Sequence, residues 1–317
     1  MTTLEAAEHE AEAKGTPQST VKTRKRPVWM ERPNPLVQVV KAIALFISVI
    51  LVIIPFWSVL ATSLADQKTI NKSAGGMVMW TSSPSLNAYK AILSGGVVTR
   101  AMIISIGITV VGTLLSLATT AGLAYWLSRK SFGSKPMLLL LLGAVLFTPG
   151  LIPSYLVVKE FNLLDSWWSL ILPVMVNAFN VIVMRAFFQE LPQELFESAE
   201  IDGASSFTIL TRIVLPLSKA VLAVIGLFYA VAYWNAFFNA LLYIQTTDKW
   251  PMALVLRTFV VNQTTIGGDQ VGMSEVMPPQ LPLQMAILVV AIVPILIVYP
   301  FLQRHFAKGV MIGAVKG

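Results

Sequence analysis

Long apolar stretches separated by short polar ones make up most of this chain, and this pattern predicts its fold class. Each of six stretches comes near the roughly 20 residues that an α-helix needs to cross the hydrocarbon core of a bilayer. Backbone polar groups inside lipid must be paired within the same segment, so we expect helices; a closed barrel would show shorter, alternating stretches. We therefore predict an all-α polytopic membrane protein with six transmembrane helices. Their approximate limits are Leu36–Leu64, Ala101–Leu127, Met137–Val158, Trp167–Phe188, Ala220–Ile244 and Leu283–Leu302.

The composition excludes several other classes of protein. Hydrophobic residues make up 56% and charged residues only 12% of the 317 residues. A soluble domain carries about 25% charged residues, and a surface with half of that would expose large apolar patches to water. The chain is therefore neither a soluble globule nor a disordered segment. The sequence has no cysteine, which excludes a disulfide scaffold, thiolate metal sites and thiol nucleophiles, and its two histidines, His9 and His305, lie at opposite ends.

Charge divides the chain into a tail and a membrane domain. Residues 1–35 are polar and carry the basic run Lys22, Arg24, Lys25 and Arg26. We interpret them as a mobile cytoplasmic tail whose basic cluster lies on anionic lipid; a nucleic-acid-binding arm is the alternative. Residues 36–317 form the transmembrane domain. Three of its segments stand out: a polar loop at 189–219, an outer loop at 245–282 and a C-terminal tail at 303–317.

The distribution of basic residues predicts the orientation. Most of the 23 Lys and Arg residues fall on the side of the membrane that holds the N-terminus. The positive-inside rule then puts both termini in the cytoplasm of a multi-pass protein of the cell membrane. Trp167, Trp168 and Trp250 come at the opposite ends of the helices, where interfacial aromatic anchors are expected.

The apolar stretches contain no acidic residue or histidine near their middle, and the chain shows no motor of its own. A carrier residue of that kind is usual in proton-coupled transporters. No Gly-Lys dipeptide occurs, so there is no phosphate-binding loop of the Walker type. Two other hypotheses remain beside a transporter driven by a separate motor: an ion-coupled secondary transporter that works alone, and a membrane-embedded enzyme. The first would need an internal repeat or an ion site, the second a catalytic set of side chains.

The 189–219 segment is far more polar than its surroundings and predicts two short helices. Pro192 suits the first position of a helix, and Glu194 lies near the positive end of the helix dipole. The pair Asp202-Gly203 predicts a turn that ends this helix. A second, largely apolar helix is expected from Ala204 to Ile213, with Leu215-Pro216 as its end.

Such a pair of amphipathic helices can dock into a groove of a partner protein. The alternative is a helix that lies on lipid. Glu190, Glu194, Glu197 and Glu200 form an acidic face, whereas lipid-bound helices on the anionic inner leaflet are usually basic. We therefore favour a protein partner over a lipid surface for this segment.

Polar and aromatic residues inside the apolar stretches are candidates for a translocation pathway. Aromatic faces stack on sugars, and amides both donate and accept hydrogen bonds; the alternative role for each residue is bonding between helices. The candidates are Asn177, Asn180, Tyr229, Tyr233, Trp234, Asn235 and Asn239. Gly112, Ser116 and Thr120 make a stripe of small residues, which we interpret as packing within the chain. Trp250–Val261 predicts a short interfacial helix that receives a binding protein or anchors in lipid.

The 189–219 segment resembles the EAA loop of ABC importer permeases. Matching positions are Glu197, Ala199, Gly203, Ile213, Leu215 and Pro216, while Ser198 stands where the motif usually has alanine. The stretches EIDGASSFTILTRIVLPL, AYWNAFFNALLY and YPFLQRHFAKGVMIGAVKG are similar to the carbohydrate importers of the maltose type, and within them to the polysaccharide or complex-sugar branch. The resemblance covers roughly residues 37–317.

The resemblance implies a function and a set of partners. The chain would be a permease subunit that moves a sugar or an oligosaccharide. Its implied partners are a second, related permease (hence a heterodimer), two copies of a cytoplasmic ATP-binding subunit and an extracellular solute-binding protein. ATP and Mg would be bound by the ATPase subunit, and this chain would hold no cofactor, metal or catalytic residue. The implied coupling residues are Glu194, Glu197, Ala199, Asp202, Gly203, Ala204, Leu215 and Pro216.

Overall fold

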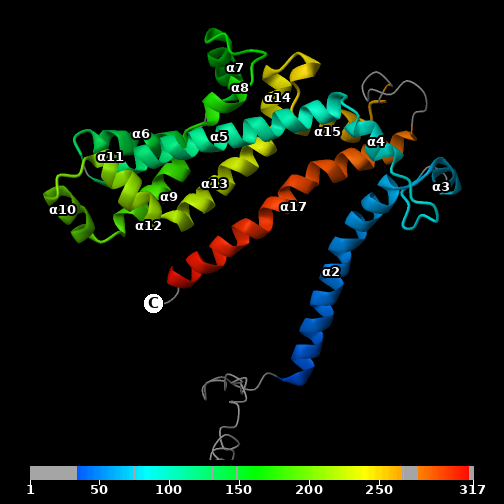
Figure 1. Cartoon of the computed structure of the whole chain (residues 1–317), viewed down its shortest axis with the longest axis horizontal. Helices are drawn as coiled ribbons and strands as arrows, with labels where there is room; N and C mark the ends of the chain where they lie inside the picture. The colour runs from blue at the N-terminus through cyan, green and yellow to red at the C-terminus, as the bar shows by residue number, and fades with distance from the viewer. Residues whose placement is uncertain are drawn as a thin grey trace, which may run out of the picture. The chain divides into compact units, whose positions relative to one another are not determined.

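The computed structural model describes residues 34–73, 76–129, 131–147, 149–265, 267 and 278–313, and every regular element in these ranges is a helix (Figure 1). The elements of the first half of the chain are α2 Pro35–Ser63, α3 Gln67–Lys72, α4 Asn87–Leu93, α5 Val97–Ser128, α6 Ser134–Leu146 and α7 Leu151–Glu160. Those of the middle are α8 Trp168–Ile171, η1 Leu172–Val174, α9 Ala178–Gln189, α10 Gln193–Ile201, α11 Ser206–Ile209, η2 Leu210–Val214 and α12 Leu215–Leu217. The last are α13 Lys219–Trp234, α14 Phe237–Tyr243, η3 Thr247–Lys249, α15 Met252–Leu256, η4 Arg257–Val261 and α17 Gln280–Gly313.

Three of these helices are long and apolar enough to cross a membrane: α2, α5 and the part of α17 that covers Gln280–Pro300. Two further apolar pairs are bent, at 52° between Trp168–Val174 and Ala178–Gln189 and at 87° between Ser206–Leu217 and Lys219–Trp234. The described residues thus give three straight spans, or up to five if each bent pair crosses once. The prediction of an all-helical membrane protein is confirmed.

The predicted third span, Met137–Val158, is not one helix. It is divided into α6 and α7, with a break around Pro149 and Gly150. Proline has no backbone N–H and disfavours the helical conformation of the residue before it, so a helix usually stops there. Continuous hydrophobicity concealed this break.

The chain divides into two units, one up to Ile53 and one from Ile54 onward. Within the first unit the described residues are mainly the N-terminal part of α2. The apolar side chains there are exposed, among them Leu45 and Phe46. A helix that is hydrophobic all round requires an apolar environment, which lipid or a partner helix supplies.

The core of the second unit is built on α5, which packs along α13 and α9. The stripe of small residues on α5 faces α13, as the prediction of packing within the chain requires. At Gly112 a Cβ atom would come within 2.8 Å of the Tyr233 ring. One and two turns further on, Ser116 and Thr120 exchange hydrogen bonds of 2.8 and 2.7 Å with the hydroxyls of Tyr233 and Tyr229. Small and hydroxyl-bearing residues therefore bring two apolar helices together and satisfy their buried polar groups.

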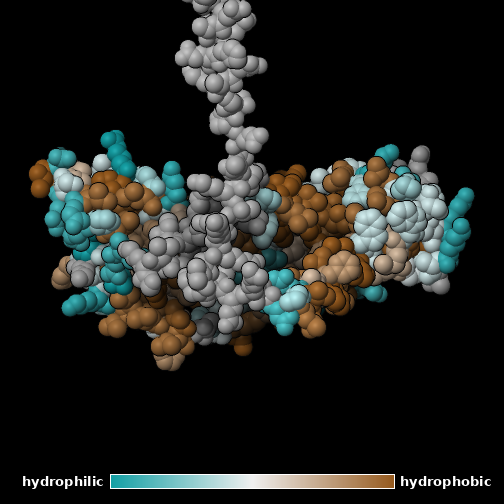
Figure 2. All heavy atoms as spheres, turned by 90° about the horizontal axis from the view of Figure 1, so that it is seen from below, coloured by the Kyte–Doolittle hydropathy of each residue, from teal (hydrophilic) through white to brown (hydrophobic). Residues whose placement is uncertain are grey.

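A second cluster joins α4 and the beginning of α5 to α15, η4 and α17. Met252, Val255 and Phe259 are buried in it. The helix predicted in the outer loop is thus present, with one face packed on the protein. Figure 2 shows hydrophobic side chains over much of one face of the molecule, with hydrophilic ones gathered mainly toward its left and right edges.

Some predictions lie outside the described residues. They concern the N-terminal tail up to residue 33, the stretches 268–277 and 266 of the outer loop, and the last four residues of the C-terminal tail.

Candidate functional site

The 189–219 segment folds locally because its ends carry the right capping residues. Pro192 is the N-cap of α10, one position before the predicted one, because its ψ of 130° is extended. Glu194 occupies the first turn, where the helix dipole favours a negative charge. At the other end Gly203 adopts a φ of +78°, a left-handed conformation that L side chains rarely take.

The turn at Gly203 closes α10 with a Schellman motif. The Ala204 N–H donates to the Ala199 carbonyl at 2.9 Å, and the Gly203 N–H donates to that of Glu200 at 3.0 Å. Both bonds satisfy carbonyls that the helix end would leave free. The predicted turn at Asp202-Gly203 is confirmed, with Asp202 as the C-cap.

The second arm of the segment runs on as α11, η2 and α12. Ser205 caps it by accepting a 3.2 Å hydrogen bond from the Thr208 N–H. The arm ends at Leu217, two residues later than predicted, since Pro216 lies within α12. The preceding π-helical turn widens the backbone, which accommodates a residue without an N–H. A sharp bend of 87° at Ser218 then leads into α13.

The sequence analysis missed the residue that ties α10 to α5. Arg129, the C-cap of α5, forms an ion pair with Glu200. Its guanidinium also lies 4.6 Å from the ring centre of Phe196, which is buried beneath α10. The Arg185 Nε donates to the Leu127 carbonyl at 3.3 Å and so holds the same end of α5 to α9. A lone arginine after a long apolar stretch, facing an acidic helix, was the available signal.

Several side chains of the segment point away from the rest of the chain. Ile201 is 86% and Phe207 74% exposed. Among the predicted coupling residues, Glu194, Glu197, Asp202, Gly203 and Pro216 are exposed. Ala199 is buried, while Ala204 and Leu215 are partly buried. The segment therefore presents an acidic surface with two large apolar side chains at its elbow.

The candidate pathway residues separate into two groups. Trp234 and Asn235, where α13 gives way to α14, line a cavity of about 310 Å³ together with residues of α15, η4 and α17. A second cavity of about 230 Å³ is lined by Asn235, Tyr233 and Asn239. Asn235 and Phe237 line both cavities, so the two adjoin at the break between α13 and α14.

The remaining candidates serve the packing of helices. The Tyr229 hydroxyl accepts a 3.1 Å hydrogen bond from the Asn177 N–H, and the Tyr233 hydroxyl is shared by Ser116 and the Ile171 carbonyl. Asn177 caps α9 by accepting from the Asn180 N–H at 3.1 Å, and Asn180 is buried. Neither asparagine lines the two cavities.

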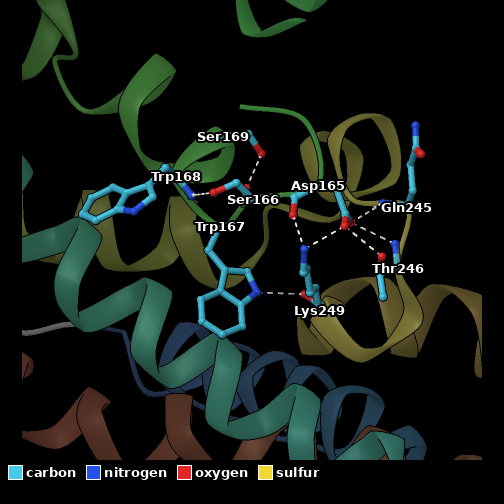
Figure 3. Close-up of polar contacts among 8 residues, drawn as sticks. All are labelled: Asp165, Ser166, Trp167, Trp168, Ser169, Gln245, Thr246 and Lys249. Atoms are coloured by element: carbon cyan, nitrogen blue, oxygen red, sulfur yellow. Dashed lines mark hydrogen bonds and ion pairs between the residues drawn. The ribbon is translucent and has the colours of Figure 1, made fainter. Parts of the chain in front are cut away.

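The end of α5 opposite the 189–219 segment carries a polar knot of Asp165, Thr246 and Lys249 (Figure 3). The Lys249 ammonium donates to the carboxylate and to the carbonyl of Asp165, both at 2.7 Å. The Thr246 hydroxyl donates to the same carboxylate at 2.8 Å. The bond from Lys249, followed by those from Thr246, holds the pKa of Asp165 below its ordinary value. Next to the knot, Arg100 at the beginning of α5 pairs with Asp248.

Comparisons with known proteins place this architecture. The family model described as "Binding-protein-dependent transport system inner membrane component" matches residues 136–312. The chain is similar to the polygalacturonan/rhamnogalacturonan transport system permease protein YtcP of Bacillus subtilis, with 42% identity over 84% of this chain and 93% of that protein. It is also similar to the protein LplC of the same organism, with 46% identity over 84% and 90%.

A solved structure agrees with these relatives. A chain of a bacterial ABC transporter involved in the import of the acidic polysaccharide alginate superimposes with a TM-score of 0.79 at 26% identity, covering 88% of this chain and all of that one. The matched family model extends over more than half of the sequence and includes the 189–219 segment, both cavities and α17. The chain therefore belongs to the family of inner membrane components of binding-protein-dependent transport systems.

Proposed function

We propose that this chain is a transmembrane permease subunit of an ABC importer, and that it forms the pathway for an oligosaccharide or a polysaccharide fragment. The observation that carries this proposal is the 189–219 segment, a capped and acidic elbow that exposes Ile201 and Phe207. A helix with an acidic face lies in water, where large apolar side chains are stable only under a partner. The family supports a transport role, and the names of the relatives support a carbohydrate.

The partner that fits the elbow is an ATPase subunit. We propose that Glu194, Glu197, Asp202 and Gly203 enter its cleft, while Ala199, Ala204, Leu215 and Pro216 shape the two arms. Movement of the elbow reaches α5 through Arg129, which pairs with Glu200 and covers Phe196. ATP can drive the change between inward- and outward-facing states only through its different affinity for the two. ATP and Mg are bound by that subunit, and this chain acts without an ATPase site of its own.

Further partners and the topology belong to the same proposal. A second, related permease completes the pathway, two ATPase copies serve the pair, and an extracellular solute-binding protein delivers the sugar. Six crossings arise if α6 and α7 together make one span in addition to the straight helices and the bent pairs. Both termini then lie in the cytoplasm. The tail 1–35 lies beside the inner leaflet, and residues 303–317 lie near the ATPase.

Replacement of the two exposed apolar side chains tests the proposal. In membranes that contain the whole transporter, Phe207→Asp and Ile201→Asp should release the ATPase subunit from the tagged chain. ATP-dependent sugar uptake should then fall at least about tenfold, because each change puts a charge into a desolvated interface. Neither side chain is buried within the chain, so the fold should persist.

Met77→Asp is the matched control, since Met77 is 50% exposed and lies outside the elbow. It should leave both the association and the uptake unchanged. Uptake that proceeds without any nucleotide-hydrolysing subunit would refute the proposal, as would normal ATPase binding by both elbow variants.

A further inference from the structure

The cavity at the break between α13 and α14 combines a cation with an otherwise apolar wall. Arg257 of η4 lines it together with Trp234, Asn235 and Phe237, and most of the remaining lining comes from aliphatic residues of α15, η4 and α17. Small-ligand sites are mostly apolar pockets with a few well-placed polar groups, of roughly 300–1,000 Å³. A volume of about 310 Å³ lies at the lower end of that range. The cavity thus suits one short part of a ligand.

Arg257 has no acidic partner among the described residues. The three ion pairs found there join other side chains, whereas the Arg257 guanidinium lies 5.8 Å from the ring centre of Phe237. Such a cation–π contact orients the planar group and leaves its N–H donors free. A guanidinium binds a carboxylate through two parallel hydrogen bonds, which makes arginine the residue suited to that anion.

The neighbours of Arg257 supply what a sugar ring needs. Trp234 and Phe237 offer aromatic faces for the C–H surface of a pyranose. The Asn235 side chain uses one N–H on the Val231 carbonyl, at 2.8 Å, so its oxygen and its second N–H remain for hydroxyl groups. Carboxylate, ring face and hydroxyls together describe a sugar acid.

The adjoining cavity extends the site along a chain. It shares Asn235 and Phe237 with the first, has a volume of about 230 Å³, and includes the amide of Asn239. No cationic residue lines it. A linear oligosaccharide could therefore place an acidic unit against Arg257 and the next unit beside Asn239.

We infer that the first cavity is a subsite for a uronic acid unit, with Arg257 binding the sugar carboxylate and Trp234, Phe237 and Asn235 holding the ring. This assignment rests on the proposed function and adds the class of substrate and the residue that selects it. The permease itself then discriminates acidic from neutral oligosaccharides, independently of the binding protein.

The test compares one oligosaccharide with and without its charges. The whole transporter is reconstituted in liposomes, and ATP-dependent uptake of trigalacturonate is measured against that of its methyl ester and of maltotriose. Arg257→Gln should lower trigalacturonate uptake about ten- to a hundredfold, since a hydrogen bond to a charged group is lost, and should leave uptake of the ester nearly unchanged. Arg257→Lys should give an intermediate loss, because it keeps the charge without the fork.

Two controls separate a subsite from general attraction or misfolding. Lys159→Gln removes an exposed cation of α7 that lines neither cavity, and should leave the preference for the acid intact. Phe237→Tyr should retain uptake of trigalacturonate, whereas Phe237→Ala should lower uptake of acid and ester alike. Affinity of the binding protein for each sugar is measured separately, since no variant alters that chain.

The outcomes distinguish this inference from the proposed function. Equal losses for acid and ester in Arg257→Gln, or no loss, would overturn the subsite and leave the importer standing. ATP-driven uptake of maltotriose alone would do the same. Absence of ATP-driven uptake of every sugar tested would overturn both.

Discussion

The two ends of α5 are secured in different ways. At its beginning, Arg100 pairs with Asp248 beside the polar knot, whose carboxylate receives hydrogen bonds from Lys249 and Thr246. At its other end, Arg129 holds α10 by one partly exposed ion pair and one ring contact. Beyond that contact Ile201 and Phe207 remain uncovered. One end thus satisfies its polar groups within the chain, while the other leaves apolar surface for a partner.

This difference indicates where movement is built in. An element with few internal contacts opens at low free energy, and moving parts are drawn from such elements. The 189–219 segment keeps its own shape through caps and turns, yet it is weakly joined to the body. It can therefore move as a rigid elbow. The knot keeps the loop after α7 and the region around η3 together at the opposite end of α5.

The largest effect is expected when the elbow loses its shape. Gly203→Val places a β-branched side chain at a φ of +78° and strains the Schellman turn, at a cost of about 1–3 kcal/mol. The angle between α10 and α11 then changes, and we expect ATP-dependent uptake to fall by more than about tenfold. Transport assays on the whole complex, with co-purification of the ATPase subunit, measure this.

Two replacements separate shape from bulk at this turn. Asn tolerates the left-handed conformation, so Gly203→Asn should keep most of the uptake. Gly107→Val is the matched control on α5, where a Cβ meets nothing within 4 Å and the backbone is helical. If Gly203→Val transported as well as Gly107→Val, the elbow would not need a fixed angle, and the contrast between the two ends would lose its basis.

A smaller effect is expected from the link between the elbow and α5. Arg129→Gln removes the pair with Glu200 and the contact with Phe196, each of which stabilises by up to about 1 kcal/mol in exposed positions. Because this contact carries movement between α10 and α5, we expect uptake to fall about three- to tenfold.

Arg100→Gln is the counterpart at the other end of α5. It also breaks an exposed ion pair, but it leaves the polar knot intact, so uptake should change less than twofold or so. Thermal unfolding of both variants in detergent checks that stability falls by similar small amounts. Equal losses of uptake in the two variants would contradict a special role for the elbow.

Local features of this fold could be predicted from the sequence, and long-range ones could not. The turn at Gly203 and the start of α10 depend on residues a few positions apart, so they were predicted to within one residue. The small-residue stripe on α5 was also recognised, because its period is that of a helix. The link of Arg129 to Glu200 spans 71 positions and the knot about 80, and no local pattern indicates such pairs.

The cavity shows the same limit. Trp234, Asn235 and Asn239 were singled out by their polarity within an apolar stretch, and they line the two cavities. Arg257 was assigned to an outer-loop helix, and only the packing of α15 and η4 on α17 brings it beside Phe237. Tyr233 was selected for the same reason as its neighbours, yet its hydroxyl pairs with Ser116 on α5. Which side of a helix a polar residue serves depends on the neighbour that packs there.

The smallest effect concerns the knot and its response to acid. The bonds from Lys249 and Thr246 hold the pKa of Asp165 below its ordinary value of about 3.9. Stability from a lowered carboxylate pKa is present above the unfolded value and is lost as the pH falls through the folded one. Asp165→Asn keeps the left-handed backbone at this position, with a φ of 56°, and removes the charge.

The difference in unfolding temperature between the original protein and Asp165→Asn should therefore be constant above about pH 5 and should shrink as the pH falls below about 4. Lys249→Met removes the other member of the pair and should produce the same narrowing, while sugar uptake at neutral pH stays within about twofold for both. Scanning calorimetry in detergent across this pH range provides the measurement. A temperature difference that did not vary with pH would show that Asp165 holds the knot through its shape alone, and the end that now looks fixed by charge would depend only on hydrogen bonding.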